Sequence, residues 1–397
     1  MIPAMKSGKY RMSNSKNESN HVIGDTTVSD LCYLVSCAVN DRVPDRERIS
    51  SMDVDAILKL ASKHMIGAAA AMALQDAGCQ TEQTGSMIGK ALRRAVLFET
   101  EWNNVRSKLE EAKIWYMPLK GAILKDYYPK YGMREMVDYD FLIDSSRQQD
   151  IKELMENLGF TADSYQETYH DVYKKPPVFN FQMHVRLFLS SKTPQITEYY
   201  ENAEERLLGE GYEKHFTKED FYLYIIAHEF KHYDYAGTGL RSLLDTYVYL
   251  KKENLDWDYV AREAAKLGLT EFERQNRELS MRLFDGEDLT EEDIKILNYM
   301  VVSGVHGSPS ILVEKKMKQN NWGKTRYALD RFLVPVSPKN EKYSAYAEQY
   351  PTFYKHKILL PFLPFYRTFH ALRKGKLQKE VRNIRRAGSY QNAGRGK

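Results

Sequence analysis

Two aspartates one residue apart, Asp138 and Asp140, are the side chains of this sequence that are best placed to do chemistry. They lie in the segment 137–143, VDYDFLI, which is otherwise mostly hydrophobic. Residues two apart in an extended strand point to the same face, so the segment predicts two converging carboxylates. Such a pair repels itself unless one carboxyl is protonated or a divalent cation binds both. The spacing therefore indicates a site for Mg²⁺ or Mn²⁺, as found where phosphoryl groups are transferred.

The residues upstream of the aspartates favour phosphate binding. Lys120 and Gly121 follow the apolar run 114–119, IWYMPL, and precede a predicted helix that begins at Ala122. Glycine lets a phosphate approach the backbone, the start of a helix offers unpaired N–H groups, and the lysine adds positive charge. Arg134 adds a second cation shortly before the aspartates. We therefore expect these residues to bind the phosphates of a nucleotide.

In this order the motifs resemble a family of bacterial nucleotidyltransferase-like proteins of the polymerase-beta superfamily. In that family Leu-Lys-Gly replaces the usual Gly-Ser, and an arginine and Asp-x-Asp follow. The matching positions here are Leu119-Lys120-Gly121, Arg134 and Asp138-Tyr139-Asp140. Further segments are similar to the family's other motifs, so the resemblance covers roughly residues 50 to 365; these segments are 58–65 (LKLASKHM), 182–187 (QMHVRL) and 228–245.

The resemblance implies metal-dependent transfer of a nucleoside monophosphate from an NTP to an acceptor hydroxyl of unknown identity. Asp138 and Asp140 would bind Mg²⁺, Lys120 with the Gly121 backbone would hold the β- and γ-phosphates, and Arg134 would orient the triphosphate. Further candidates for substrate contact are one strand residue and four residues of a helical wall: His184, His228, His232, Arg241 and Asp245. The last two are four residues apart, which predicts an ion pair along one helix face.

One position departs from the family pattern. A third acidic residue is expected on a strand after the aspartate pair, and the matching residue is Gln182. An amide offers a carbonyl oxygen to a metal, but it cannot ionise and so cannot deprotonate an acceptor hydroxyl. Nearby candidates for a general base are Asp171, Glu167 and His184. A nucleotide-binding pseudoenzyme or regulator that lacks the third carboxylate is therefore the main alternative.

A second motif, HEFKH at residues 228–232, satisfies the H-E-x-x-H pattern of zinc hydrolases. Its two histidines are four residues apart and share a helix face. The longer metzincin pattern fails, because Tyr235 and Thr238 stand where its Gly and His belong. Glu253 is the only convenient downstream carboxylate. A zinc hydrolase through His228 and His232 is therefore a minor alternative that needs a third metal ligand.

Hydrophobic periodicity places helices on both sides of a short strand-rich region. Helical patterns dominate residues 26–112 and 193–338, with breaks at 209–211 and 237–239. Strand signals are confined to 113–192 and predict strands at 114–116, 138–143, 159–161, 168–173 and 179–188, with a helix at 150–158. Together with the resemblance, this pattern predicts an α+β fold in which helical regions flank a small mixed β-sheet nucleotidyltransferase core.

Residues 339–397 differ in composition from the rest of the chain. Their first part is rich in Tyr, Phe and Pro, and a strongly basic tail follows Leu372. Such a tail predicts a solvated segment, with weak contact to an anionic membrane surface or to RNA as the alternatives. The formal net charge of the whole chain is only +4, which gives no clear indication of a nucleic-acid partner.

The ends and the cysteines of the chain bear on its location. Residues 1–25 are polar and Ser/Asn-rich without an apolar core, which predicts a disordered leader and not a signal peptide. The three cysteines form no CxxC motif, which argues against a disulfide framework or a zinc ribbon. No apolar run approaches the roughly 20 residues that span a bilayer. These features together predict a cytoplasmic protein.

Overall fold

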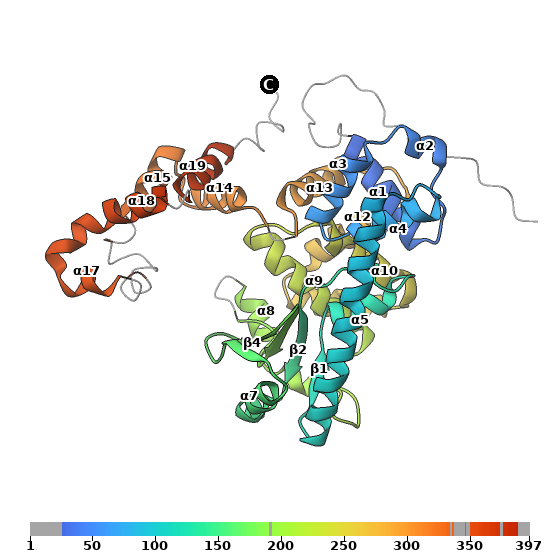
Figure 1. The fold of residues 1–397 in the computed structure, drawn as a ribbon, viewed down its shortest axis with the longest axis horizontal. Helices are drawn as coiled ribbons and strands as arrows, with labels where there is room; N and C mark the ends of the chain where they lie inside the picture. The colour runs from blue at the N-terminus through green and yellow to red at the C-terminus, as the bar shows by residue number, and fades with distance from the viewer. Residues whose placement is uncertain are drawn as a thin grey trace, which may run out of the picture. The chain divides into compact units, whose positions relative to one another are not determined.

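The computed structural model describes residues 26–189, 193–305, 307–333, 336, 346, 350–373 and 376–387. The chain divides into two compact units, which are residues 25–322 and residues 323–397 with 1–24 (Figure 1). The predicted leader over residues 1–25 lies outside the described residues, as does the end of the basic tail after residue 387. The first unit contains every candidate site residue named above.

The first unit is built around a five-stranded sheet with the strand order β1-β2-β5-β4-β3. β2 and β5 run parallel, whereas the other three neighbouring pairs are antiparallel. The strands are β1 (Tyr116–Pro118), β2 (Tyr139–Ile143), β3 (Thr161–Ser164), β4 (His170–Lys175) and β5 (Phe179–His184). Helices precede and follow these strands along the chain, so the predicted α+β class with a small mixed sheet is confirmed.

Three strands, β1, β3 and β4, begin two residues later than the sequence pattern predicted. The N–H of Ile114 still bonds to the carbonyl of Leu109 at 2.9 Å, so the end of the preceding helix delays β1 until Tyr116. The turn before β3 contains Gly159 at φ +83°, a backbone conformation that favours glycine. Local periodicity locates these strands, but hydrogen bonds at the helix ends decide where pairing begins.

One face of the sheet packs on α5 (Glu82–Glu111) and α7 (Gln148–Asn157). Tyr139, Phe141 and Ile143 point to this face and join a buried cluster with Phe98 and Trp102 of α5. The Trp102 and Phe141 rings stack with their centroids 3.8 Å apart. The odd-numbered residues of β2 therefore form the core, which leaves the even-numbered ones for the opposite face.

The opposite face of the sheet is covered by the helices that follow it. Leu142 and Leu119 share a buried cluster with side chains of α9 (Lys218–Tyr235). Thr217 caps the start of α9, because its side chain accepts a hydrogen bond from the N–H of Asp220 at 3.0 Å. Asp140 points to the same face as Leu142, because the two residues are two apart in one strand.

The N-terminal helices of the first unit are α1 (Thr26–Val39), α2 (Arg46–Ser50), α3 (Val54–Lys63), α4 (Gly67–Asp76) and α5. They confirm the predicted helical region, and α5 begins with a capping box between Thr81 and Thr84. Just after α3, the buried His64 accepts a hydrogen bond at Nδ1 from the N–H of Leu240, 3.2 Å away. This bond joins the N-terminal helices to the start of α10 (Leu240–Lys252).

Further helices of the first unit are α8 (Pro194–Tyr199), α11 (Trp257–Lys266), α12 (Thr270–Asp285), α13 (Glu291–Ser303) and α14 (Pro309–Gln319). The predicted break between α9 and α10 is confirmed. Gly237 adopts φ +92° there, and a Cβ at this position would lie 1.9 Å from Ser303 Oγ. The chain can turn from α9 into α10 at this point because the residue has no side chain.

The second unit contains short helices. Over its described residues they are α15 (Lys324–Leu333), α17 (Pro351–Lys355), the 3₁₀ helix η5 (Lys357–Phe362), α18 (Leu363–Arg373) and α19 (Lys376–Arg386). Phe332 of α15 contacts Phe365 of α18 edge to face, with the ring centroids 5.1 Å apart. Over the described ranges of both units, no helix is long and apolar enough to cross a membrane.

Candidate functional site

A cavity of about 290 Å³ in the first unit brings together ten of the eleven candidate residues. Its walls come from β2, β5, α9, α10 and the connection between β1 and β2. The ten residues are Lys120, Arg134, Asp138, Asp140, Gln182, His184, His228, His232, Arg241 and Asp245. Gly121, the eleventh, is next to Lys120 in the chain and packs against Arg134. Segments far apart in the sequence thus meet at one place.

Asp140 is held by two neighbouring side chains. Its Oδ1 accepts a hydrogen bond from His184 Nε2 at 2.8 Å and lies 3.3 Å from Lys120 Nζ. Burial alone would raise the pKa of Asp140, but Lys120 and His184 outweigh burial and hold that pKa well below its ordinary value. Asp140 is therefore a carboxylate anion throughout the physiological pH range.

The backbone around Lys120 delivers this side chain to Asp140. The N–H of Leu119 donates to the carbonyl of Asp140 at 2.9 Å, which fixes the chain beside β2. Lys120 itself has φ +44°, a conformation that costs a lysine roughly 1–3 kcal/mol and that persists where the surroundings impose it. Helix α6 (Gly121–Leu124) follows and has only four residues, so its dipole adds little to the charge of Lys120.

His184 serves to position Asp140. Burial lowers the pKa of His184 to about 4, against the opposing effect of Asp140. Because Asp140 is an anion, His184 Nε2 carries the proton between them and Nδ1 is left as an acceptor. In the described part of the chain His184 Nδ1 has no hydrogen-bond partner, and the ring stacks on His170 at 5.0 Å. A ring with this pKa is a poor general base near pH 7.

Asp138 and Gln182 form the other half of the carboxylate site. Burial raises the pKa of Asp138, and the charge of Asp140 raises it further, against Lys120 and Arg241. Gln182 lies directly beside Asp140 in the parallel β2–β5 register. Gln182 Nε2 donates a hydrogen bond to Asp138 Oδ2 at 3.1 Å. The amide therefore stands where the resemblance led us to expect a third carboxylate.

These donors fit a hard divalent cation. Mg²⁺ is commonly held by one or two carboxylates and completes its shell with water and phosphate oxygens, so Asp138 and Asp140 are a sufficient set. A cation between them would relieve the repulsion that raises the pKa of Asp138. Gln182 would offer its carbonyl oxygen after a flip of its amide.

Arg134 forms a buried bidentate ion pair with Asp245 of α10. Nε and Nη2 of Arg134 donate to the two carboxylate oxygens, each at 2.8 Å. The Tyr128 hydroxyl also donates to Asp245, at 2.7 Å. A Cβ on residue 121 would lie 2.4 Å from Arg134 Nη1, so only glycine leaves room for the guanidinium. The pair joins the β1–β2 connection to α10.

The ion pair predicted between Arg241 and Asp245 is wrong, because Arg134 takes this carboxylate instead. Arg241 Nη1 donates to the carbonyl of Glu135 and to Met65 Sδ, each at 3.3 Å. Burial lowers the pKa of Arg241, and the charge of Arg134 lowers it further. Among the described residues no carboxylate lies within ion-pair distance of Arg241. Its charge faces a cavity without a direct counter-ion.

Lys231 is a cavity residue that the sequence analysis did not select. It lies on α9 between the two histidines, and its Nζ donates to the Tyr169 hydroxyl at 2.9 Å. Burial lowers the pKa of Lys231. Over the ranges that the structure describes, it has no carboxylate partner either. Lys231 is three residues after His228 and therefore shares its helix face, and this spacing was the feature of the sequence that could have indicated it. Lys231 and Arg241 together favour an anionic ligand.

The H-E-x-x-H segment forms part of this cavity, but the described residues bring no third zinc ligand to its histidines. Nε2 of His228 and Nε2 of His232 lie 3.2 Å apart. Glu229 is buried, which raises its pKa to about 8, so the carboxyl is mostly protonated at neutral pH. Glu253 accepts a hydrogen bond from Tyr127 at 2.7 Å. Within the described chain no three His, Cys, Asp or Glu side chains gather around one metal position.

Two of the three candidates for a general base lie away from the cavity. Asp171 pairs with Met183 in the β4–β5 register, and Met183 belongs to the core on the α5 face. Asp171 therefore points to the far side of the sheet, where its Oδ2 accepts from Gln148 Nε2 at 2.7 Å. Glu167 is exposed in the turn between β3 and β4. Strand alternation thus separates Asp171 from the site, whereas Glu167 lies in a turn outside it.

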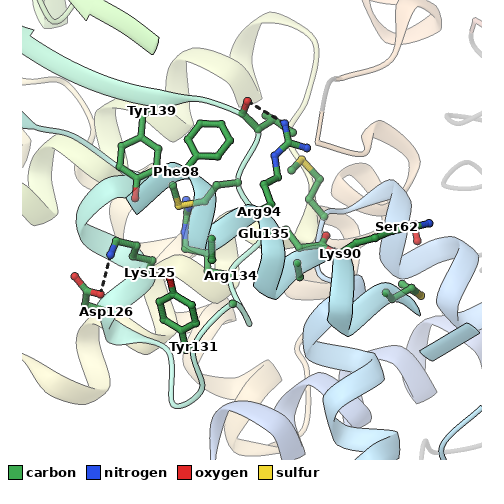
Figure 2. A pocket seen from close by; sticks show the side chains of 17 residues that line it. Ser62, Lys90, Arg94, Phe98, Lys125, Asp126, Tyr131, Arg134, Glu135 and Tyr139 are labelled. Atoms are coloured by element: carbon green, nitrogen blue, oxygen red, sulfur yellow. Dashed lines mark hydrogen bonds and ion pairs between the residues drawn. The ribbon is translucent and has the colours of Figure 1, made fainter. Parts of the chain in front are cut away.

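A second cavity, of about 370 Å³, adjoins the first and shares Met65, Arg134 and Val137 with it. Figure 2 shows Arg94 and Phe98 projecting into it from α5. Arg94 Nη2 donates to the carbonyl of Val137 at 3.4 Å, and Arg94 Nε has no partner among the described residues. The rest of the lining is largely apolar or aromatic and includes Met87, Ala91, Ala95, Tyr131, Met136 and Tyr139.

Paired carboxylates on a mixed sheet, with cations around the same cavity, are typical of proteins that bind or transfer phosphoryl groups. A family model described as uncharacterised nucleotidyltransferase matches residues 50–285. The match covers more than half of the chain, so the chain belongs to this family. It includes the whole sheet and every candidate site residue. No curated protein and no solved structure matches the chain significantly.

Proposed function

We propose that the protein transfers a nucleoside monophosphate from an NTP to an acceptor hydroxyl, with Mg²⁺ or Mn²⁺ as cofactor. The acceptor oxygen bonds to the α-phosphorus, the bond from that phosphorus to the bridging oxygen breaks, and pyrophosphate leaves. The acceptor proton passes to a base or to water. The observation that carries this proposal is the cavity that combines Asp138 and Asp140 with the cations Lys120, Lys231 and Arg241.

Each side chain then has a defined task. Asp138 and Asp140 hold the cation, which supplies positive charge to the phosphate oxygens. Lys231 and Arg241 bind the triphosphate, because no carboxylate within the described residues neutralises either of them. Lys120 shares its charge between Asp140 and the nucleotide. Arg134 positions the β1–β2 connection, since its guanidinium is already bound to Asp245.

The second cavity offers room for the acceptor. It adjoins the nucleotide cavity through Met65, Arg134 and Val137, so a bound molecule there lies close to the carboxylate pair. Its apolar and aromatic lining with the cation Arg94 suits an acceptor that has an apolar body and an anionic group. We assign the nucleotide to the first cavity and the acceptor to the second.

The proposed location is the cytoplasm, where NTPs are abundant. Cys32, Cys37 and Cys79 are all free thiols, and the first two are buried in α1. Free cysteines are usual in a reducing compartment. This supports the location but does not bear on the reaction.

A nucleotide-binding regulator without turnover is the second candidate function. Gln182 favours it, because an amide next to Asp138 donates a hydrogen bond where a base would have to accept a proton. The carboxylate pair and the three cations would then serve binding alone. Gln182→Glu separates the two functions: it creates or strongly raises turnover in a regulator, whereas in an enzyme adapted to glutamine it leaves turnover similar or lowers it.

The test is transfer of label from each α-³²P-NTP, with Mg²⁺, to small molecules or proteins of a nucleotide-depleted cell extract. The expected result is a labelled product together with pyrophosphate, and neither from Asp138→Asn/Asp140→Asn. Transfer only by Gln182→Glu would support the regulator. Label transfer that persists in the double aspartate variant would contradict the assigned site.

A further inference from the structure

Exposed apolar side chains are concentrated in the second unit. Within this unit, the largest exposed fractions lie between Ile358 and Leu372, at 82% for Ile358, 63% for Phe362, 64% for Phe365 and 61% for Phe369. Globular surfaces rarely place so many large apolar residues in one short segment, and such patches mark interaction sites. This segment lies outside the region matched by the family model, so the nucleotide site does not account for it.

The exposed residues follow the repeat of a helix. Phe365, Phe369 and Leu372 occur at i, i+4 and i+7 in α18 and therefore share one face of that helix. Ile358 and Phe362 extend the apolar surface into η5. Because Leu372 is also 52% exposed, the apolar face runs over the whole length of α18. We call these five residues the apolar face of the second unit.

Basic residues flank this face along the sequence. Between residues 351 and 386 the only acid is Glu380, and it forms an ion pair with Arg331 at 2.9 Å. The basic residues of the same stretch are Lys355, Lys357, Arg367, Arg373, Lys374, Lys376, Lys379, Arg382, Arg385 and Arg386. Tyr366 lies on α18 between the apolar and basic positions and is 49% exposed. An apolar face with basic flanks and a bordering tyrosine has the composition of an interfacial membrane helix.

We propose that the second unit binds the surface of an anionic lipid bilayer, with the apolar face of α18 and η5 among the acyl chains. The basic residues of α19 and of the flanking segments would contact the anionic headgroups. Aliphatic Ile358 and Leu372 fit acyl chains, whereas a nucleic-acid surface would use aromatic rings alone for stacking. Charge complementarity thus favours an anionic bilayer over a neutral one, and the aliphatic residues favour a bilayer over RNA. This proposal is independent of the proposed reaction.

The test is flotation of the full-length protein with vesicles of phosphatidylcholine alone and of phosphatidylcholine with phosphatidylglycerol, at low and high salt. We expect binding to the anionic vesicles, weakened by salt, and at least about tenfold weaker binding to the neutral ones. Phe365→Ser/Phe369→Ser should lose about tenfold or more in affinity for anionic vesicles. Lys379→Glu/Arg382→Glu should lose binding at low salt.

Matched control variants make the same kinds of substitution at exposed positions of the first unit. Val43→Ser/Val96→Ser removes two exposed apolar residues of the first unit, at 68% and 53% exposure, and should bind vesicles like the wild type. Lys59→Glu/Arg93→Glu makes the same change in net charge on exposed positions of α3 and α5 and should retain most of the binding. All variants change exposed residues, so an unchanged melting temperature confirms that they fold.

Other outcomes overturn the proposal. Failure of the wild type to float with anionic vesicles excludes a lipid surface as the partner. Flotation that is unaffected by Phe365→Ser/Phe369→Ser excludes the apolar face. If the protein does not float but binds single-stranded RNA in a salt-sensitive way, the unit binds RNA instead. If it does not float but forms a dimer that Phe365→Ser/Phe369→Ser dissociates, the apolar face serves self-association.

Discussion

Arg134 and Arg241 line the same cavity, yet their surroundings give them different tasks. Arg134 is neutralised by Asp245 in a bidentate pair, and Tyr128 supports that carboxylate. Arg241 bonds only to the Glu135 carbonyl and to a methionine sulfur among its described contacts. A paired guanidinium stabilises the fold, whereas one without a counter-ion is available to a phosphate.

Methionine substitutions should separate these two roles. Arg134→Met leaves Asp245 as an unpaired buried charge, so we expect the free energy of unfolding to fall by about 3–5 kcal/mol. Arg241→Met removes a desolvated cation, so the stability should change little while affinity for NTP falls at least about tenfold. Denaturant titration and calorimetric binding measure the two quantities. Equal losses of stability in both variants would contradict this assignment.

Gly121 should be intolerant of a side chain because of Arg134. The Cβ of Gly121→Ala would meet Arg134 Nη1 at 2.4 Å, and the guanidinium cannot withdraw without loosening its pair with Asp245. We expect a loss of about 1–3 kcal/mol in the free energy of unfolding. Gly89→Ala is the matched control, because nothing lies within 4 Å of its Cβ position in α5. That variant should gain about 0.5–1 kcal/mol from helix propensity.

His184 should contribute to the loss of stability in acid. Burial lowers its pKa from the ordinary value of 6.5, which applies to the unfolded chain, to about 4. Between these values the unfolded chain binds more protons, so stability falls as the pH falls, by at most about 1.4 kcal/mol per pH unit from one histidine. His184→Gln keeps a donor for Asp140 but cannot titrate. Its melting temperature should fall less steeply with pH than that of the wild type; equal slopes would argue against a neutral buried His184.

The individual residues differ in how far the sequence alone could identify them. Asp138, Asp140 and Lys120 were predicted from local patterns, because a strand alternation and a strand-to-helix junction are encoded within a few residues. The partner of Arg134 was not predicted, since Asp245 lies 111 residues further along the chain. Only the tertiary arrangement of α10 against the β1–β2 connection creates that contact, and it also overrides the local i, i+4 pair with Arg241.

At the level of the elements, the sheet was predicted strand by strand but its order was not. Periodicity identifies five strands, while the order β1-β2-β5-β4-β3 brings β5 beside β2 in parallel. This pairing places Gln182 next to Asp140 and sends Asp171 to the other face. Strand order arises from how the helices cover the two faces, which no local window contains.

A larger side chain on helix α5 should fill the second cavity without affecting nucleotide binding. Ala95 lies on the face of α5 that lines this cavity, so Ala95→Trp fills space there while leaving the carboxylate pair unchanged. We expect the variant to keep the Mg²⁺-dependent stabilisation by NTP and to lose acceptor-dependent turnover. Thermal unfolding with and without nucleotide provides the first measurement. Loss of the nucleotide effect would place part of the nucleotide in the second cavity and refute our assignment.

The whole molecule combines two compact units with different surface chemistry. The family match at residues 50–285 lies within the first unit, which contains both cavities. The second unit carries the exposed apolar face and the basic helices. A net charge of +4 over 397 residues conceals this division, because acids of the first unit offset the basic residues of the second. The proposed nucleotide chemistry and the proposed membrane binding therefore belong to separate parts of one chain.

The central claim is that Asp138 and Asp140 form a metal-dependent nucleotide site. The most direct test is the thermal stability of the full-length protein with ATP, GTP, CTP or UTP, each with and without Mg²⁺, for the wild type and for Asp138→Asn/Asp140→Asn. At a nucleotide concentration about 100-fold above Kd, linkage predicts about 2.7 kcal/mol of added stability. We expect at least one NTP to stabilise the wild type only with Mg²⁺, and none to stabilise the double variant. No stabilisation by any nucleotide, or equal stabilisation of the double variant, would contradict the account.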